Sequence, residues 1–261
     1  MLETARYEAS RRVRGTVVLT VALSLYVAFI VWYYTVLEGV DYDQMLESMP
    51  PALMDAFGIE TMATIEGFLG SQIYNFVWLL ALGLYFAYVG GGLIADDIEK
   101  DRMDLLLSFP VSRARLLAEK VASLLLPLVT LNVVIAVVTY ALVLAIGETI
   151  DPVDLALVHL LSIPYLLVCV AIGVVCSVLV DRAAIAERAA LGVVFALFLV
   201  ESVVGGASDF EWLQYVSPTY YYEPTPMLIN GTYDLADTGV LLALFAILLL
   251  GSQLLFRRRD I

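Results

Sequence analysis

Six long apolar runs limit this chain to one class of fold. A hydrocarbon core of about 30 Å requires roughly 20 apolar residues in one helix, and a transmembrane β-strand needs about half as many. No strand-like alternation competes with the runs, and a hydrophobic share of 61% is too high for a soluble domain. We therefore predict an all-α integral membrane protein with spans at about 15–37, 71–95, 121–147, 155–180, 189–207 and 239–256.

Basic residues fall on only one side of this topology. All 14 Lys and Arg residues lie before the first span, between the second and third, between the fourth and fifth, or after the sixth. Because cytoplasmic segments retain Lys and Arg, we predict that both termini are cytoplasmic. We expect the membrane to be the plasma membrane. Most acidic residues lie on the other side, and only two residues are Lys. We interpret this composition as that of a halophile.

Residues 1–14 are predicted to form a separate amphipathic helix in the cytoplasmic interface. Leu2, Ala5, Ala9 and Val13 recur at helical spacing, and four arginines add a basic flank that favours anionic headgroups. The alternative is a charged tail that only sets the topology. Residues 15–261 then form a single six-helix domain.

The outer segment before the sixth span is rich in proline and aromatic residues. Ser217-Pro218, Tyr220–Tyr222, Pro224 and Pro226 predict a broken-helix insertion at the outer membrane surface. Asn230-Gly231-Thr232 matches the N-glycosylation pattern, and a pattern this short also occurs often by chance.

Few polar residues interrupt the spans. Glu201 either lines a pathway or lies nearer the outer headgroups than the span boundary implies, because buried acids are costly in a membrane. Amide side chains within spans commonly join helices by hydrogen bonds, and we expect this role for Asn75 and Asn132. His159, the only histidine, has no Cys or carboxylate at ligand spacing, so no metal site is predicted. Gly90–Gly92 allow either close helix packing or a hinge.

The inner segment 95–120 has the most informative pattern, and we call it the signature segment. Acids precede three leucines, so a helix over 96–108 is expected with its acids at the favourable N-terminal end. Pro110 would end this helix and Ser112 would cap the next. The leucines either enter the groove of a partner or pack back beneath the second and third spans.

The signature segment resembles that of ABC transporter permeases of the type-two exporter family. Their pattern is an acid, Gly-Thr-Leu, Leu-Leu-Leu-Ser, any residue, Pro-Val-Ser-Arg, and a Lys seven residues on. Asp101-Arg102 replaces the Gly-Thr pair here. Pro50-Pro51-Ala52-Leu53 and Glu66-Gly67-Phe68-Leu69 resemble the family's first outer loop, and Glu8 with Arg11 and Arg12 resembles its N-terminal helix. In the signature segment, Asp97 or Glu99 fills the acidic place, and the direct matches are Leu105, Leu106, Leu107, Ser108, Pro110, Val111, Ser112, Arg113 and Lys120.

This resemblance implies a permease subunit of an ATP-driven exporter. The outer aromatic residues and apolar helices suit a lipid-like or amphipathic substrate that moves outward, although the family also exports drugs, peptides and glycans. Two cytoplasmic ATPase subunits would bind ATP and Mg, and a second permease would complete the complex. Membrane lipid is a partner, and nucleic acid is not. Asn75 and Glu201 become candidates for the translocation path, since the first, second and fifth helices line it in the family. The coupling helix, at 97–109, would dock the ATPase through Asp97, Glu99, Leu105, Leu106, Leu107, Ser108, Pro110 and Arg113.

The residues themselves give no sign of catalysis. No G-x-x-x-x-G-K-[ST] loop is present, so ATP hydrolysis is expected in a separate chain and no cofactor in this one. An intramembrane enzyme would need a nucleophile with its base or metal ligands, and neither H-E-x-x-H nor G-x-S-x-G occurs. An ion-coupled transporter is the other alternative, although one buried acid and no half-to-half repeat give it little support.

Overall fold

The computed structural model describes residues 3–37, 61–108, 111–204 and 211–259, and every structural statement below refers to them. Within these ranges the secondary structure is entirely helical. Six helical segments are long and apolar enough to cross a membrane, which confirms the predicted all-α membrane fold with six spans. These segments are Ala5–Val36, Ile65–Glu99, Arg113–Ala145, Pro152–Leu179, Ala183–Ser202 and Leu235–Arg258.

Several of the spans are longer than their apolar runs. The second span joins α4 (Ile65–Leu69), the π-helix η1 (Gly70–Leu82) and α5 (Gly83–Glu99). Hydrophobicity locates only the part of a helix that lies in hydrocarbon, whereas the backbone hydrogen bonds continue into the polar ends. The remaining elements, in chain order, are α1 (Glu3–Val36), α6 (Met103–Leu107), α7 (Arg113–Ala122), α8 (Leu125–Ala145), α9 (Pro152–Leu179), α10 (Ala183–Val204), η2 (Glu211–Val216), η3 (Pro218–Tyr221), α11 (Pro224–Asn230) and α12 (Leu235–Arg258).

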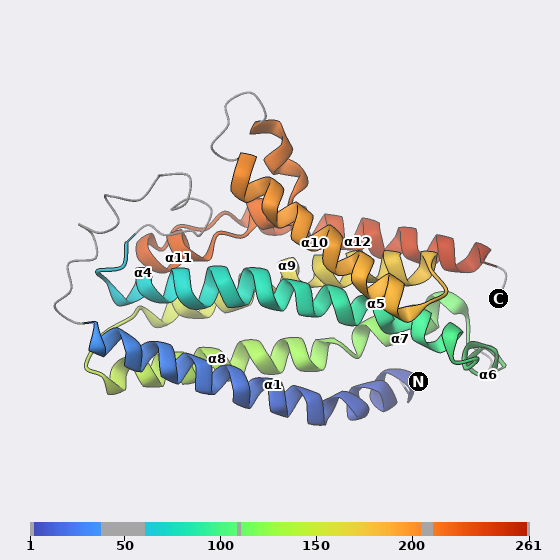
Figure 1. Cartoon of the computed structure of the whole chain (residues 1–261), viewed down its shortest axis with the longest axis horizontal. Coiled ribbons are helices and arrows are strands. Elements are labelled where there is room, and N and C mark those ends of the chain that lie inside the picture. Colours follow the sequence, from blue (N-terminus) through green and yellow to red (C-terminus); the bar gives the residue numbers. More distant parts are fainter. Residues whose placement is uncertain (1–2, 38–60, 109–110, 205–210, 260–261) are drawn as a thin grey trace.

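Helix α9 occupies the centre of the bundle. It packs against α5, α8, α10 and α12, and α1 packs on the outer side of α8 (Figure 1). In the most apolar window of α9, 67% of the residues are buried, against 17% for α12. The termini, α6 and α7 lie at one end of the bundle, which we call the basic end, and α4 and α11 lie toward the other (Figure 1). The two ends therefore carry different groups of elements.

Helix α1 is continuous from Glu3 to Val36, with no break at the predicted boundary between residues 14 and 15. Its axis bends toward the N-terminus in Figure 1. The hydroxyls of Thr16, Thr20 and Ser24 each donate to the carbonyl four residues earlier, at 2.8–2.9 Å. This pattern weakens the regular ladder and bends helices. The basic N-terminal segment is thus joined to the first span without an intervening loop.

The expected single helix over 96–108 is wrong. Helix α5 ends at Glu99, and Asp101 has a φ of 51° in the left-handed region, which Asp tolerates better than most residues. The Arg102 N–H donates to the Asp97 carbonyl at 2.8 Å and closes the turn before α6 begins. The expected cap at Ser112 is confirmed, because its hydroxyl accepts the Arg115 N–H at 3.3 Å.

The third span is divided between α7 and α8 at Ser123 and Leu124. Pro127 lies in the first turn of α8 and has no N–H to donate to the Ser123 carbonyl. In an unbroken helix its ring would also clash with this carbonyl. Ser123 donates its hydroxyl to the Lys120 carbonyl at 2.6 Å. The third span is therefore interrupted at Ser123 and Leu124, but both of its helices remain part of the bundle.

The three successive glycines are sites of close packing. A Cβ at Gly90 would lie 2.5 Å from the Val170 carbonyl oxygen of α9, and one at Gly91 would lie 2.9 Å from Glu187 Cα of α10. Both contacts are with backbone, so neither neighbour can move easily. Helix α5 continues through all three residues. Of the two interpretations left open by the sequence, close packing therefore accounts for Gly90 and Gly91.

Gly90→Ala should lower the free energy of unfolding by roughly 2 kcal/mol, because the added methyl overpacks the contact between α5 and α9. Gly192→Ala is the matched control, since a Cβ there meets nothing within 4 Å. It should leave stability unchanged or raise it slightly through helix propensity. Denaturant unfolding in detergent measures both variants, and an equal loss in the two would contradict the packing argument.

Candidate functional site

The signature segment lies at the basic end, where α6 projects past α5 and α7 (Figure 1). Met103 anchors this short helix and is only 1% exposed, whereas Asp104 and Ser108 are exposed. Leu106 is half-buried and packs against the core. The side chains of Leu105 and Leu107, and Pro110 entirely, lie outside the described residues. Among the described side chains, α6 thus has an anchored face and a polar exposed face.

Asp97 is at the centre of a buried group of charges. Its carboxylate pairs with Lys120 Nζ at 2.5 Å and with Arg102 Nη2 at 2.9 Å. Lys120 also pairs with Glu8 at 3.3 Å, and Arg102 pairs with Asp96 at 2.5 Å. We call Glu8, Asp96, Asp97, Arg102 and Lys120 the ion-pair cluster. It joins α1, the end of α5, the turn before α6, and α7.

The ion-pair cluster is shielded from solvent at its centre. The side chains of Lys120 and Asp97 are only 4% and 7% exposed. Charges taken out of water gain from pairing only when each retains a partner, and loss of one partner leaves the other uncompensated. Asp97 is therefore held inside the protein, although the resemblance placed it among the docking residues.

Lys120→Met should lower the free energy of unfolding by roughly 3 kcal/mol, because Glu8 and Asp97 would both lose a buried partner. Lys100→Met is the matched control. Lys100 pairs with Asp96 at 2.6 Å, but its side chain is 58% exposed, so the expected loss is below about 1 kcal/mol. Denaturant unfolding in detergent compares the two variants, and similar losses would show that burial does not set the strength of the cluster.

Glu99 belongs to the same end of α5 but has a different role. Its Oε2 accepts the backbone N–H of Ala183, the first residue of α10, at 2.8 Å. The first N–H groups of a helix have no partner within the helix, and a carboxylate is favoured there. Glu99 thus fixes the start of α10 against the end of α5.

Two arginines satisfy carbonyl groups at the C-terminal ends of helices. Arg113 Nη1 donates to the carbonyls of Phe256, at 3.1 Å, and of Arg259. Arg259 in turn donates to the Val178 carbonyl near the end of α9 and pairs with Asp181. The last four carbonyls of a helix need such external donors. Arg113, a residue of the signature segment, therefore holds α7 to the end of α12.

Of the two path candidates, Asn75 contacts α11, and Glu201 interacts with the residue that precedes it. Asn75 Nδ2 donates to Thr225 Oγ1 of α11 at 2.9 Å. Glu201 is half-buried and interacts electrostatically with Glu223, the residue that precedes α11. The region between α10 and α12 forms η2, η3 and α11. Its helix α11 packs against α4, η1 and α9.

A buried polar network around Asn132 was only partly predicted. Asn132 Oδ1 accepts from Ser162 Oγ at 2.8 Å, from Trp78 Nε1 at 3.3 Å and from His159 Nδ1 at 3.2 Å. Tyr74 Oη lies 3.0 Å from His159 Nε2. The expectation that Asn132 joins helices is confirmed, since η1, α8 and α9 all contribute. The sequence signal for it was an amide and a lone histidine in adjacent apolar spans.

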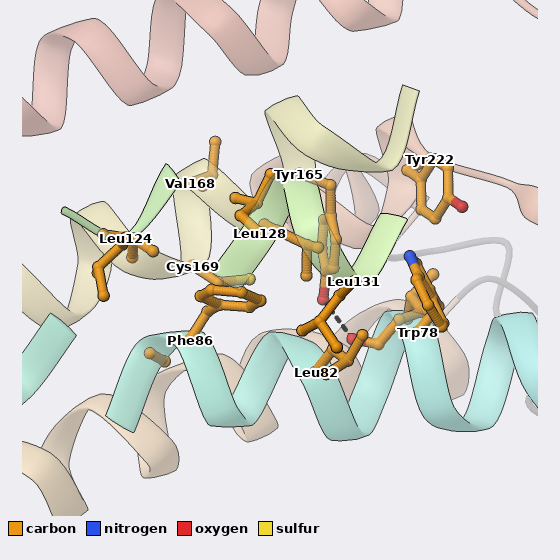
Figure 2. Close-up of a cluster of buried hydrophobic side chains, with 14 of the residues drawn as sticks. Trp78, Leu82, Phe86, Leu124, Leu128, Leu131, Tyr165, Val168, Cys169 and Tyr222 are labelled. Carbon is orange, nitrogen blue, oxygen red and sulfur yellow. Dashed lines mark hydrogen bonds between the residues drawn. The ribbon is translucent and has the colours of Figure 1, made fainter. Parts of the chain in front are cut away.

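The π-helix has its own buried support. Tyr165 Oη donates to the Leu79 carbonyl at 2.7 Å, beside the change from π- to α-helix at Gly83 (Figure 2). A Cβ at Gly83 would lie 2.6 Å from this hydroxyl, so only glycine leaves room for it. π-Helical turns commonly mark functional positions. This π-helix packs closely against α11 at its first residue, because a Cβ at Gly70 would lie 2.8 Å from Thr225 Oγ1.

Comparison with known proteins places the chain in a family through one match. A comparison with curated proteins gives no match. The family model described as ABC-2 family transporter protein matches residues 8–261, which include all six spans except the first residues of α1. The chain therefore belongs to the ABC-2 transporter family, as a membrane component of transport.

Proposed function

We propose that the chain is the permease subunit of an ATP-driven exporter and that α6 is its docking element. The observation that carries this proposal is that side chains of the signature segment hold four spans together. The ion-pair cluster ties the turn before α6 to α1, α5 and α7. Arg113 ties the start of α7 to α12. A force applied to α6 would therefore reach four helices rather than one loop.

The docking partners in this proposal are two ATPase subunits that bind ATP and Mg. Asp104 is exposed on α6 and Ser108 is exposed directly after it, and Met103 anchors the helix from the other side. A short helix presented in this way has the form that a groove on a partner receives. Leu105 and Leu107, which match the family pattern, would add apolar contacts. Both termini would then be cytoplasmic, in agreement with the positions of the basic residues.

A second permease is part of the same proposal. The most apolar windows of α1, α10 and α12 are only 22%, 22% and 17% buried. Such faces contact either lipid or another subunit, and a homodimer or a pair of related permeases would cover part of them. The plasma membrane is the proposed location.

The substrate class is proposed from the outer aromatic residues. Trp212, Tyr215 and Tyr233, on and after the insertion, are 62%, 52% and 48% exposed. Aromatic rings of this kind favour the region between headgroups and acyl chains. Asn75 and Glu201 provide polar groups beside α11. A lipid-like or amphipathic molecule that leaves outward would meet both kinds of surface.

The docking role predicts that Asp104→Arg separates the permease from its ATPase. The protein would be purified in mild detergent from its own cells, and Mg-dependent ATP hydrolysis would be measured in the eluted complex. Loss of a central contact should reduce the co-eluting activity by about tenfold or more. Glu148→Arg is the matched control, because it makes the same change of charge at an exposed residue in the turn between α8 and α9.

Two outcomes would contradict the proposal. Equal ATPase retention by the two variants would remove α6 as the docking element. Transport by the purified chain alone in liposomes, without ATP or a partner, would instead favour the ion-coupled transporter. The same liposomes, loaded with fluorescent lipid, would report the direction of movement.

A further inference from the structure

The π-helix η1 brings two residues of the second span to one partner on α11. Asn75 Nδ2 donates to Thr225 Oγ1 at 2.9 Å, and a Cβ at Gly70 would lie 2.8 Å from the same oxygen. Gly70 and Asn75 are five positions apart, which is the spacing of the residues that a π-helical hydrogen bond joins. In an α-helix with 3.6 residues per turn, they would point about 140° apart. The contact of both residues with Thr225 therefore depends on π-helical geometry.

This geometry ends at Gly83, where the backbone hydrogen bonds change. The Gly83 N–H donates to the Leu80 carbonyl, and not to the Leu79 carbonyl that it would reach in an α-helix. The Leu79 carbonyl accepts the Tyr165 hydroxyl in its place, at 2.7 Å (Figure 2). Tyr165 is only 1% exposed, and a buried carbonyl needs a donor within the protein. The Tyr165 hydroxyl thus replaces the hydrogen bond with which α-helical geometry would begin.

The Tyr165 hydroxyl and an α-carbon substituent at Gly83 exclude each other. A Cβ at Gly83 would lie 2.6 Å from the hydroxyl oxygen, but 3.4 Å from the nearest ring carbons. The ring itself is held from another side, because it stacks on Tyr222 with centroids 5.8 Å apart and planes 18° apart. Removal of the hydroxyl alone would therefore leave the ring in place and free the Leu79 carbonyl.

We propose that Tyr165 is a positioning residue for the translocation path, because its hydroxyl fixes the end of η1 and so keeps Asn75 against Thr225. Without the hydroxyl, the Gly83 N–H can donate to the Leu79 carbonyl, and α5 extends backwards at the expense of η1. Asn75 then turns away from α11. This inference rests on the proposed function, in which Asn75 lines the path, but the position of Asn75 can be measured without transport.

Cross-linking measures that position directly. Asn75→Cys and Thr225→Cys would be combined in the complete protein, oxidised in native membranes with copper phenanthroline, and the linked peptides counted by mass spectrometry. Tyr165→Phe should lower the cross-linking rate by about fivefold, which is the effect of one ordinary hydrogen bond on an equilibrium. Tyr140→Phe on α8 is the matched control and should leave the rate unchanged. It removes the hydroxyl of a half-buried tyrosine that makes no hydrogen bond to another described residue.

Gly83→Ala tests the same contact without changing Tyr165. The added methyl displaces the hydroxyl from the Leu79 carbonyl, so this variant should also lower the cross-linking rate. Beside Phe at position 165, the methyl meets only ring carbons at 3.4 Å, so the double variant should cross-link no more slowly than either single variant. Gly83→Ala should likewise lower the melting temperature of the wild type but not that of Tyr165→Phe, where only its better helix propensity remains.

A third measurement relates the position of Asn75 to transport. The complex with its ATPase would be reconstituted in liposomes, and ATP hydrolysis would be measured together with the movement of fluorescent phosphatidylethanolamine. Tyr165→Phe should retain ATP hydrolysis, because α6 lies beyond the opposite end of the second span (Figure 1). It should move about fivefold less lipid per ATP hydrolysed, in proportion to the lost cross-link.

Three results would overturn the proposal. One is a cross-linking rate in Tyr165→Phe equal to that of the wild type. Another is an additive loss in the double variant, which would show that the hydroxyl and Gly83 act independently. The third is unchanged lipid movement per ATP in Tyr165→Phe after its cross-link has been lost. Failure of the wild-type complex to move lipid would instead contradict the proposed substrate class, because the cross-linking rates do not depend on it.

Discussion

The fold depends on one constraint, which is that polar groups inside a membrane must find their partners within the protein. Asn132 meets this constraint for three helices at once. Its Nδ2 donates to the Leu128 carbonyl at 2.9 Å, so its Oδ1 is left as an acceptor. The His159 Nδ1 that faces it must then carry the proton, and in the neutral ring Nε2 accepts from the Tyr74 hydroxyl. The network therefore fixes one tautomer and one arrangement of η1, α8 and α9.

The same constraint explains the basic end, where helices terminate near the edge of the membrane. Glu99 accepts an N–H at the start of α10, and Arg113 and Arg259 donate to carbonyls at the ends of α12 and α9. Lys120 is buried because two carboxylates surround it. Residues that the family pattern marks as a signature thus satisfy groups of the chain itself, and within the described signature segment α6 carries the exposed side chain of Asp104.

The sequence was sufficient to predict the class of fold, because the length of an apolar run is a local property. It also located the Ser112 cap and the bridging role of Asn132. It did not predict that α5 would end at Glu99, since the turn depends on the backbone of Asp101 and on the pairing of Arg102 with two acids. Nor did it show that Lys120 meets Glu8, a contact across 112 positions. Such pairs follow from tertiary packing, for which sequence spacing gives no signal.

The second span connects the two regions on which the proposed function depends. It runs from α4, beside α11, to the end of α5 at the ion-pair cluster. Close contacts at Gly90 and Gly91 leave α5 little freedom to slide against α9 and α10. The π-helix, by contrast, departs from regular α-geometry, and its position is set by Tyr165 and the Asn132 network. Under the proposed function, a movement of α6 would pass along a rigid α5, and the π-helix would be the place where it changes the contact with α11.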